Sequence, residues 1–269
     1  MSDSRPIGIF DSGMGGLTAV KEVIRALPYE RIVYFGDTAR VPYGPKSRET
    51  VIRFSIENIL FLLKYKVKLI IIACNTASSV ALSIARKNFK VPIIGVISPG
   101  VDEAVRVTKN KRIGVIGTRT TINSQTYEKM IKQQSPKIKV YSAECPLFVP
   151  LVEVGWLNTQ ITKQVAGLYL LPLKSKKIDT IVLGCTHYPL LKPVIKEILG
   201  QGVTLVDSAR QVAMQAKEIL IRQRLLAPKK NRGEGNLRFY VSDEPDNFAE
   251  LGKRFLGFDL KNVRKVSNV

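Results

Sequence analysis

Two sets of four short apolar runs follow one another along the chain with nearly the same internal spacing. The runs of the first set begin at Ile7, Ile32, Leu69 and Ile93, and those of the second at Ile113, Ile138, Thr180 and Val203. Continuous runs of Val, Ile and Leu are typical of strands that are buried on both faces of a parallel sheet. Local identity supports a duplication, since Ile7-Gly8 corresponds to Ile113-Gly114. The sequence therefore predicts two α/β lobes related by pseudo-two-fold symmetry.

Between these runs, the apolar residues recur with the period of a helix. One such stripe consists of Leu17, Val20, Val23, Ile24 and Leu27. Helices that alternate with buried strands predict mainly parallel sheets covered by helices. We assign residues 1–97 plus 208–269 to the first lobe and residues 98–207 to the second, with the active site in the cleft between them.

The residues after Asp207 are predicted to return to the first lobe. They contain a helical stretch from Ala209 to Leu225, a basic linker from Pro228 to Gly235 and a strand from Leu237 to Val241. The linker combines Gly, Pro and charged residues, which makes it the candidate for a mobile loop.

Parallel α/β sheets bind their ligands at the carboxyl ends of the strands. Residues that fall at or just past these ends are Asp11, Asp37, Cys74, Gly117, Glu144 and Cys185. The two cysteines end two similar segments, LIIIACNTASS and TIVLGCTHYPL. Two thiols that face each other across a cleft suit a reaction that removes a proton from one face of a carbon atom and returns a proton to the other face.

Each of these thiols is expected at the start of a helix, where backbone N–H groups would lower its pKa below the free value of about 8.5. For the first helix, we predict a span from Ser79 to Asn88 with Thr76 or Ser78 as its N-cap. Cys145 has no duplicated counterpart and is interpreted as a buried or incidental thiol. Three cysteines at distant positions do not predict a disulfide framework.

Two further residues carry candidate chemistry. Asp11 heads the loop DSGMGG, and its carboxylate suits a substrate ammonium better than a pyrophosphate. His187 is the only histidine, and it is placed to tune Cys185 or to deliver a proton, although a lone histidine is more often structural. The cysteines lack the close pairing of a zinc site, so no metal is predicted. The G-x-S-x-G turn of a serine hydrolase is also absent from the sequence.

The composition is strongly basic, with 42 Lys and Arg against 22 Asp and Glu and a net charge of +20. This charge is compatible with nucleic-acid binding or with a basic surface on an enzyme of small anions. The basic residues are dispersed and no nucleic-acid motif is present, so we favour the enzyme. No apolar run approaches the roughly 20 residues of a membrane helix, and MSDSRPIGIF does not resemble a secretory signal. We therefore expect a cytoplasmic protein.

Five motifs in order resemble those of glutamate racemases. They are DSGMGGL from Asp11, PYG from Pro42, ACNTAS from Ala73, PLVEVG from Pro150 and GCTHYP from Gly184, and the resemblance runs from about Ile7 to Ser208. It implies an amino-acid racemase that interconverts L- and D-glutamate without a cofactor and supplies D-glutamate for peptidoglycan, hence for cell wall biogenesis and cell shape. It also implies that Cys74 serves the D-isomer and Cys185 the L-isomer.

The same resemblance implies roles for other residues. Expected to bind substrate are Asp11, Ser12, Tyr43, Gly44, Asn75, Thr76, Thr118, Thr121, Thr186 and His187. Expected to assist proton movement or to tune the thiols are Asp11, Glu153 and His187. Members of this family are often homodimers, and some glutamate racemases also inhibit DNA gyrase.

Three alternatives stay open at this point. The chain could be a racemase of aspartate or of another acidic amino acid, since aspartate racemases share the two-cysteine plan. It could be a basic nucleic-acid-associated regulator, in which case contact with nucleic acid or gyrase would explain its charge. A nucleotide-binding Rossmann protein is the third, and Asp11 argues against it.

Overall fold

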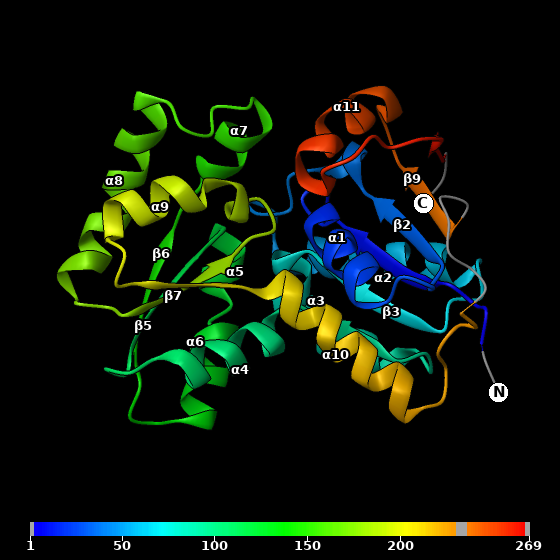
Figure 1. Cartoon of the computed structure of the whole chain (residues 1–269), viewed down its shortest axis with the longest axis horizontal. Helices are drawn as coiled ribbons and strands as arrows, with labels where there is room; N and C mark the ends of the chain where they lie inside the picture. The colour runs from blue at the N-terminus through cyan, green and yellow to red at the C-terminus, as the bar shows by residue number, and fades with distance from the viewer. Residues whose placement is uncertain (1–2, 230–235, 267–269) are drawn as a thin grey trace.

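The computed structural model describes residues 3–229 and 236–266, and two parallel sheets organise them (Figure 1). The first sheet has the order β10-β9-β2-β1-β3-β4. Its strands are β1 (Ile7–Asp11), β2 (Ile32–Gly36), β3 (Leu69–Ile72), β4 (Ile93–Gly95), β9 (Leu237–Val241) and β10 (Val263–Lys265). The second sheet has the order β6-β5-β7-β8. Its strands are β5 (Arg112–Gly117), β6 (Lys139–Glu144), β7 (Thr180–Gly184) and β8 (Thr204–Asp207).

The order β2-β1-β3-β4 in the first sheet recurs as β6-β5-β7-β8 in the second, and every strand pair is parallel. The predicted fold class, two similar units of mainly parallel sheet and helices, is therefore confirmed. The lobe boundaries at residues 97/98 and 207/208 stay a prediction, although β1 to β4, β9 and β10 belong to one sheet and β5 to β8 to the other.

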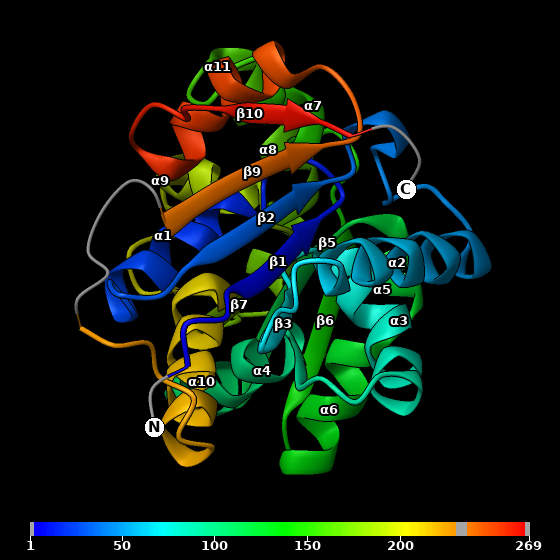
Figure 2. The same cartoon turned by 90° about the vertical axis from the view of Figure 1, so that its right-hand side faces the viewer.

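Helices cover both faces of each sheet (Figures 1 and 2). The helices are α1 (Leu17–Ala26), η1 (Thr38–Arg40), α2 (Arg48–Leu63), α3 (Asn75–Asn88), α4 (Ile97–Val107), α5 (Arg119–Asn123), α6 (Thr126–Gln134), α7 (Phe148–Glu153), α8 (Gln160–Ser175), η2 (Tyr188–Leu191), α9 (Lys192–Leu199), α10 (Ser208–Arg222) and α11 (Pro245–Leu256). On the first sheet, α10 and α11 pack against α1, while α2 and α3 pack together on the opposite face. On the second sheet, α8 packs with α9, and α4 packs with α6.

Alternate strand residues build the core on the two faces of the first sheet. Ile7 and Ile9 of β1 belong to a large apolar cluster that also contains Leu17 of α1, whereas Phe10 belongs to the cluster under α2 and α3. The large cluster continues into the second lobe, where it includes Leu183 beside Cys185. Burial of this apolar surface is the main force that holds the two lobes in one arrangement.

The C-terminal segment returns to the first sheet, as predicted. Strand β9 pairs parallel with β2, and β10 pairs parallel with β9. The predicted helix from Ala209 to Leu225 is α10, which ends at Arg222. Most of the predicted linker from Pro228 to Gly235 lies outside the described residues, since these stop at 229 and resume at 236.

The predicted start of α3 is wrong. The helix begins at Asn75, and Cys74 is its N-cap, with the Cys74 Sγ accepting a hydrogen bond from the Ala77 N–H at 3.4 Å. A thiol thus takes the place that a hydroxyl usually occupies. Ser78 instead donates its hydroxyl to the Ile72 carbonyl at 2.8 Å, which ties the helix to the end of β3. Over residues 3–229 and 236–266, no helix has the length and hydropathy needed to cross a membrane.

Candidate active site

A cavity of about 470 Å³ lies between the two lobes, and both Cys74 and Cys185 line it. Its walls come from the loops after β1, β2 and β3 on one side and from those after β5, β6 and β7 on the other. These are carboxyl ends of parallel strands, where the fold places ligands. The lining residues are Ser12, Val41, Pro42, Tyr43, Gly44, Pro45, Cys74, Asn75, Thr76, Thr118, Arg119, Pro146, Val149, Pro150, Glu153, Val154, Cys185, Thr186 and His187.

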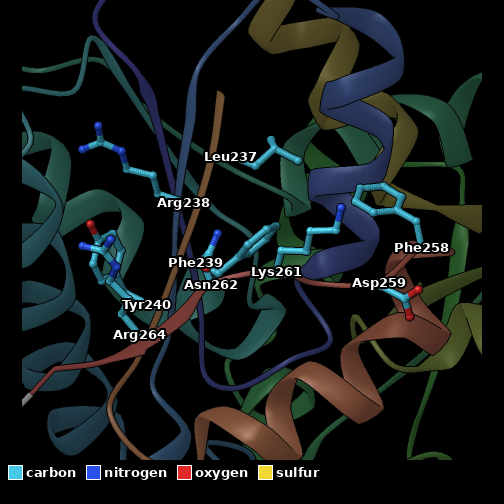
Figure 3. Close-up of a pocket in the computed structure, with 9 residues that line it drawn as sticks. All are labelled: Leu237, Arg238, Phe239, Tyr240, Phe258, Asp259, Lys261, Asn262 and Arg264. Carbon is cyan, nitrogen blue, oxygen red and sulfur yellow. The ribbon is translucent and has the colours of Figure 1, made fainter. Parts of the chain in front are cut away.

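A second cavity, of about 510 Å³, lies along β9, β10 and the segment before β10 (Figure 3). Arg238, Lys261 and Arg264 give it a basic character. Its lining contains neither cysteine nor histidine. Those two side chains titrate closest to neutral pH, so the cavity between the lobes is the candidate active site.

Cys74 lies two residues after the end of β3 and is almost fully buried. Its thiol lies 3.6 Å from the Ser12 Oγ, to which it donates a hydrogen bond. Burial, together with the negative charge of Asp11, raises the pKa of the Cys74 thiol to about 12. The expected lowering of the pKa of Cys74 is therefore wrong, because desolvation outweighs the hydrogen bond from the start of α3. Cys74 is a neutral thiol at physiological pH.

Cys185 lies at the end of β7 and faces a buried histidine. The Cys185 Sγ is 3.9 Å from the His187 Nδ1, and the His187 Nε2 is 3.1 Å from the Glu153 Oε1. Burial alone would lower the pKa of His187, but its contacts with Cys185 and Glu153 outweigh burial and raise the pKa to about 10. His187 is therefore an imidazolium held between a sulfur atom and a carboxylate.

Asp11 is fully buried and does not line the cavity. Its Oδ2 accepts a hydrogen bond from the Gly13 N–H at 3.0 Å, while its Oδ1 has no hydrogen-bond partner among residues 3–229 and 236–266. Burial raises the pKa of Asp11, and the nearby charge of His187 lowers it. Asp11 therefore acts on Cys74 and His187 through its charge, without reaching the cavity itself.

A cluster of hydroxyl groups joins the lobes on the other side of the cavity. The Thr76 Oγ1 lies 2.9 Å from the Thr118 Oγ1, and the Thr121 Oγ1 lies within 3.3 Å of both. Thr121 is buried and lies outside the cavity lining, whereas Thr76 and Thr118 line it. Asn75, which also lines the cavity, donates its side-chain amide to the Tyr127 hydroxyl at 2.8 Å. The Thr186 Oγ1 lies 3.5 Å from the His187 Nδ1.

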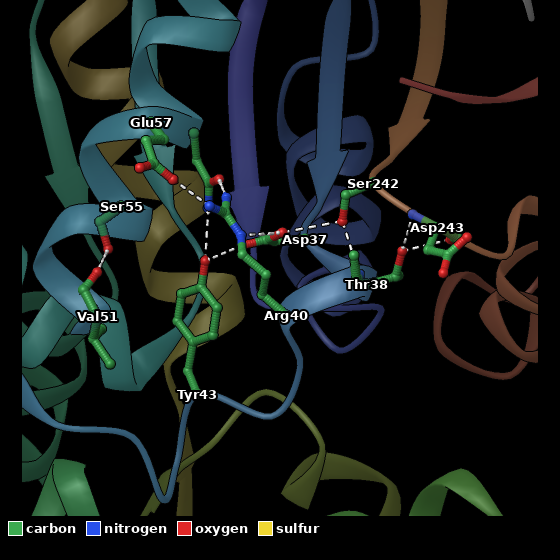
Figure 4. A network of polar contacts seen from close by, with 11 residues as sticks. Asp37, Thr38, Arg40, Tyr43, Val51, Ser55, Glu57, Ser242 and Asp243 are labelled. Atoms are coloured by element: carbon green, nitrogen blue, oxygen red, sulfur yellow. Dashed lines mark hydrogen bonds and ion pairs between the residues drawn. The ribbon is translucent and has the colours of Figure 1, made fainter. Parts of the chain in front are cut away.

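The hydroxyl of Tyr43 is directed toward Asp37 and Arg40 (Figure 4). This hydroxyl donates to Asp37 and accepts a hydrogen bond from the Asn58 amide at 3.1 Å. Asp37 is fully buried and also binds the Arg40 guanidinium, which reaches Glu57 and Asn58 as well. Tyr43 thus anchors the loop over residues 41–45, which forms one part of the cavity wall.

The same loop reaches the second lobe through Gly44. The Gly44 carbonyl accepts hydrogen bonds from the Thr120 N–H at 3.1 Å and from the Thr120 hydroxyl at 2.9 Å. A Cβ on Gly44 would lie 2.8 Å from the Thr118 Cβ, so only glycine permits this approach. The loop therefore closes one side of the cavity at a fixed distance from the second lobe.

Several residues of the site escaped the prediction from sequence. Apolar lining residues that it missed are Val41, Pro42, Pro45, Pro146, Val149, Pro150 and Val154. Of these, Pro42, Pro150 and Val154 stand in recognised motifs, but apolar residues near strand ends are not distinguishable from core residues by pattern alone. The network of Arg40, Glu57 and Asn58 was also missed, because Glu57 and Asn58 lie 17 and 18 residues after Arg40, so the contacts have no local pattern.

We expect Arg40→Met to lower the free energy of unfolding by about 3 kcal/mol, because it leaves the buried Asp37 carboxylate without its cation. Arg25→Met is the matched control, since Arg25 forms an exposed pair with Glu22 that contributes less than about 1 kcal/mol. Urea unfolding of both variants measures the difference. Equal losses would contradict the structural importance of the network.

We expect His187 to keep its proton through neutral pH and to lose it only near pH 10, because its pKa is raised from the ordinary 6.5. As the only histidine, it gives imidazole signals in ¹⁵N-labelled protein that need no further assignment. Titration by NMR measures the pKa directly. A midpoint near the ordinary value would show that the contacts with Cys185 and Glu153 do not hold a cation.

The sequence and the fold of this chain are both similar to those of known proteins. The profile of the family described as Asp/Glu/Hydantoin racemase matches residues 12–216. The chain is 51% identical over 263 residues to the glutamate racemase of Geobacter metallireducens, covering 98% of this chain and 97% of that protein.

Solved structures agree with the sequence comparison. The crystal structure of glutamate racemase isoform RacE1 from Bacillus anthracis superposes with a TM-score of 0.93 at 41% identity and covers 97% of each chain. The glutamate racemase of Francisella tularensis, crystallised in complex with D-glutamate, superposes with a TM-score of 0.92 at 42% identity and covers 98% of each chain.

Proposed function

This chain belongs to the Asp/Glu/Hydantoin racemase family and is a glutamate racemase, and we propose that it moves the Cα proton of glutamate between the thiols of Cys74 and Cys185. The observation that supports this proposal is that the two cysteines line one cavity but have different electrostatic surroundings. Cys74 is a buried neutral thiol, whereas Cys185 faces the His187 imidazolium. A two-base reaction needs one acid and one base at the same moment.

In the direction from L to D, Cys185 acts as the base. Its thiolate, paired with the imidazolium of His187, takes the proton from Cα of L-glutamate. The Cys74 thiol then gives its own proton to the opposite face of the carbanion, which yields D-glutamate. Cys185 ends as a thiol and Cys74 as a thiolate, and this is the state that the reverse reaction needs.

The carbanion must be stabilised as negative charge spreads onto the α-carboxylate. We propose that the hydroxyls of Thr76 and Thr118 and the backbone N–H groups at the start of α3 bind the substrate carboxylates. Ser12, Asn75 and Thr186 line the same cavity and complete the set of polar contacts. These groups are already held in place by contacts within the protein, so little reorganisation is needed during the reaction.

The assisting residues act through charge and position. Asp11 disfavours a second negative charge at Cys74, which keeps that thiol protonated between turnovers. Glu153 holds the His187 ring through Nε2, which directs Nδ1 toward the Cys185 sulfur. Tyr43 and Gly44 contribute through the placement of their loop and its backbone.

The wider biological role is also a proposal. The resemblance to glutamate racemases supports supply of D-glutamate for peptidoglycan. A mechanism that depends on free thiols suits the reducing cytoplasm, and Cys74, Cys145 and Cys185 are all free. A homodimer is supported by exposed apolar side chains on α8, including Leu168 and Leu171. Contact with nucleic acid or gyrase has only the net charge of +20 in its favour.

The activity is tested by incubating the pure protein with L-glutamate in D₂O without pyridoxal phosphate. We expect the optical rotation to decay to zero and deuterium to enter at Cα. L-Aspartate under the same conditions tests the alternative substrate. Deuterium entry with aspartate and none with glutamate would contradict the proposed substrate.

We expect Cys74→Ala and Cys185→Ala each to lower turnover about 10³-fold or more in both directions, because each thiol is needed once in either direction. The two variants should differ in isotope exchange. Cys74→Ala keeps the base for the L-isomer, so it should exchange Cα–H of L-glutamate without racemising it, and Cys185→Ala should do so with D-glutamate.

Cys145→Ala is the matched control, since Cys145 is buried and does not line the cavity. It should retain activity close to that of the unmodified protein. Near-normal racemisation by either cavity variant would overturn the two-thiol mechanism, and exchange of the opposite enantiomer would reverse the assignment of the two thiols.

A further inference from the structure

We propose that α11, in the C-terminal segment, positions the Cys185 half of the acid–base pair through Phe255 and Arg254. This inference rests on the proposed function, since it concerns how one of the two thiols is prepared for proton transfer. Helix α11 belongs to the first lobe, where it packs on α1, and it lies close to α7 of the second lobe (Figures 1 and 2). Phe255 and Arg254 are therefore positioning residues that act across the lobe boundary.

Phe255 forms one wall around His187. Its ring is buried, with 3% exposure, and its centroid lies 5.3 Å from that of His187 at an interplanar angle of 81°. The Gly-rich loop of the first lobe closes another side, since a Cβ on Gly15 would lie 2.2 Å from the Thr186 Oγ1 and 2.6 Å from the His187 Nδ1. The Phe255 ring and the Gly-rich loop thus restrict rotation of the imidazole away from Cys185 on the sides that do not face the cavity.

Arg254 fixes the end of α7, from which Glu153 reaches His187. The Arg254 Nη1 donates a hydrogen bond to the Glu153 carbonyl at 3.1 Å. This carbonyl is one of the terminal groups that a helix leaves without an internal partner. A cation at this end of the helix is also favourable.

Gly155, in the motif PLVEVG, makes the approach of Arg254 possible. A Cβ on Gly155 would lie 2.7 Å from the Arg254 Nη1, and the backbone at Gly155 has φ of +80°, which favours glycine. The chain therefore turns sharply after Glu153 and leaves space for the guanidinium. This gives the last residue of the motif a physical role that the proposed reaction alone does not explain.

The contacts around Cys74 come from its own lobe, whereas those around Cys185 involve both lobes. Cys74 is contacted by Ser12 and Ala77 of the first lobe, to which Cys74 itself belongs. Cys185 depends on His187, and His187 is held by Glu153 of its own lobe and by Phe255 of the other. Separation of the lobes would therefore disturb the Cys185 half first, and changes in α11 should affect proton transfer at Cys185 while sparing Cys74.

The variants Phe255→Leu and Arg254→Met test the inference, and Lys253→Met is the control. Lys253 lies on the same helix but forms an exposed ion pair with Asp259. We expect Phe255→Leu to lower kcat/KM about tenfold and Arg254→Met to lower it severalfold. The loss must be equal in both directions, because the two enantiomers have equal free energy and the equilibrium constant is unity.

Primary deuterium isotope effects separate the two thiols. When the Cys185 step becomes slower, removal of the proton from L-glutamate limits the rate more, so the effect on kcat/KM with L-[2-²H]glutamate should rise. The effect with D-[2-²H]glutamate should fall, because reprotonation by Cys185 then limits that direction. A general loss of structure would move both isotope effects together or neither.

The NMR titration of His187 gives a second readout that does not depend on activity. The titratable groups near His187 are Cys185, Glu153 and Asp11, and the contacts with Cys185 and Glu153 raise its pKa above the ordinary value. Water admitted by Phe255→Leu should screen these contacts and lower the pKa of His187 toward 6.5. Lys253→Met should leave it unchanged.

The outcomes distinguish this inference from the proposed function. An active parent protein whose variants keep both isotope effects and the His187 titration would overturn the role of α11 and leave the racemase mechanism intact. A parent protein that does not racemise glutamate would overturn the proposed function itself. Because Arg254 is exposed, Arg254→Met is expected to fold, so it can still test the inference if Phe255→Leu does not fold.

Discussion

The site depends on a buried cation, His187, held between the sulfur of Cys185 and the carboxylate of Glu153. Burial by itself disfavours the charged imidazole, so these two contacts must outweigh the desolvation cost. They can do so only while β7 and α7 keep Cys185 and Glu153 on either side of the ring and while the first lobe closes over it. The ionisation state of His187 therefore depends on the arrangement of the two lobes.

The charged neighbours of the two thiols also explain why one can act as the acid while the other acts as the base. The duplicated fold places Cys74 and Cys185 at equivalent strand ends, yet the surroundings of the two copies have diverged. Near Cys74 the charged neighbour is the buried carboxylate of Asp11, which favours the neutral thiol, whereas near Cys185 it is a cation. A symmetric scaffold with asymmetric charges provides an acid and a base on either side of one cavity.

Much of this could be predicted from the sequence, because apolar runs, helical stripes and residues at strand ends are local patterns. What was missed depends on contacts between distant segments. The raised pKa of Cys74 comes from tertiary burial, and the direction of the buried Tyr43 side chain follows from its hydrogen bonds with Asp37 and Asn58. The start of α3 was misplaced because a thiol is an unusual N-cap. The contact of Phe255 with His187 has no local signature at all.

The central claim is that the two sulfur atoms approach one carbon atom from opposite faces. A crystal structure of the protein with bound glutamate tests it most directly. We predict that Cα lies between the Sγ atoms of Cys74 and Cys185, which stand on opposite sides of the substrate and each within about 3.5 Å of Cα, the separation of reacting atoms that are placed for reaction. A complex with both sulfur atoms on the same side of Cα, or with either one beyond reach of it, would contradict the account.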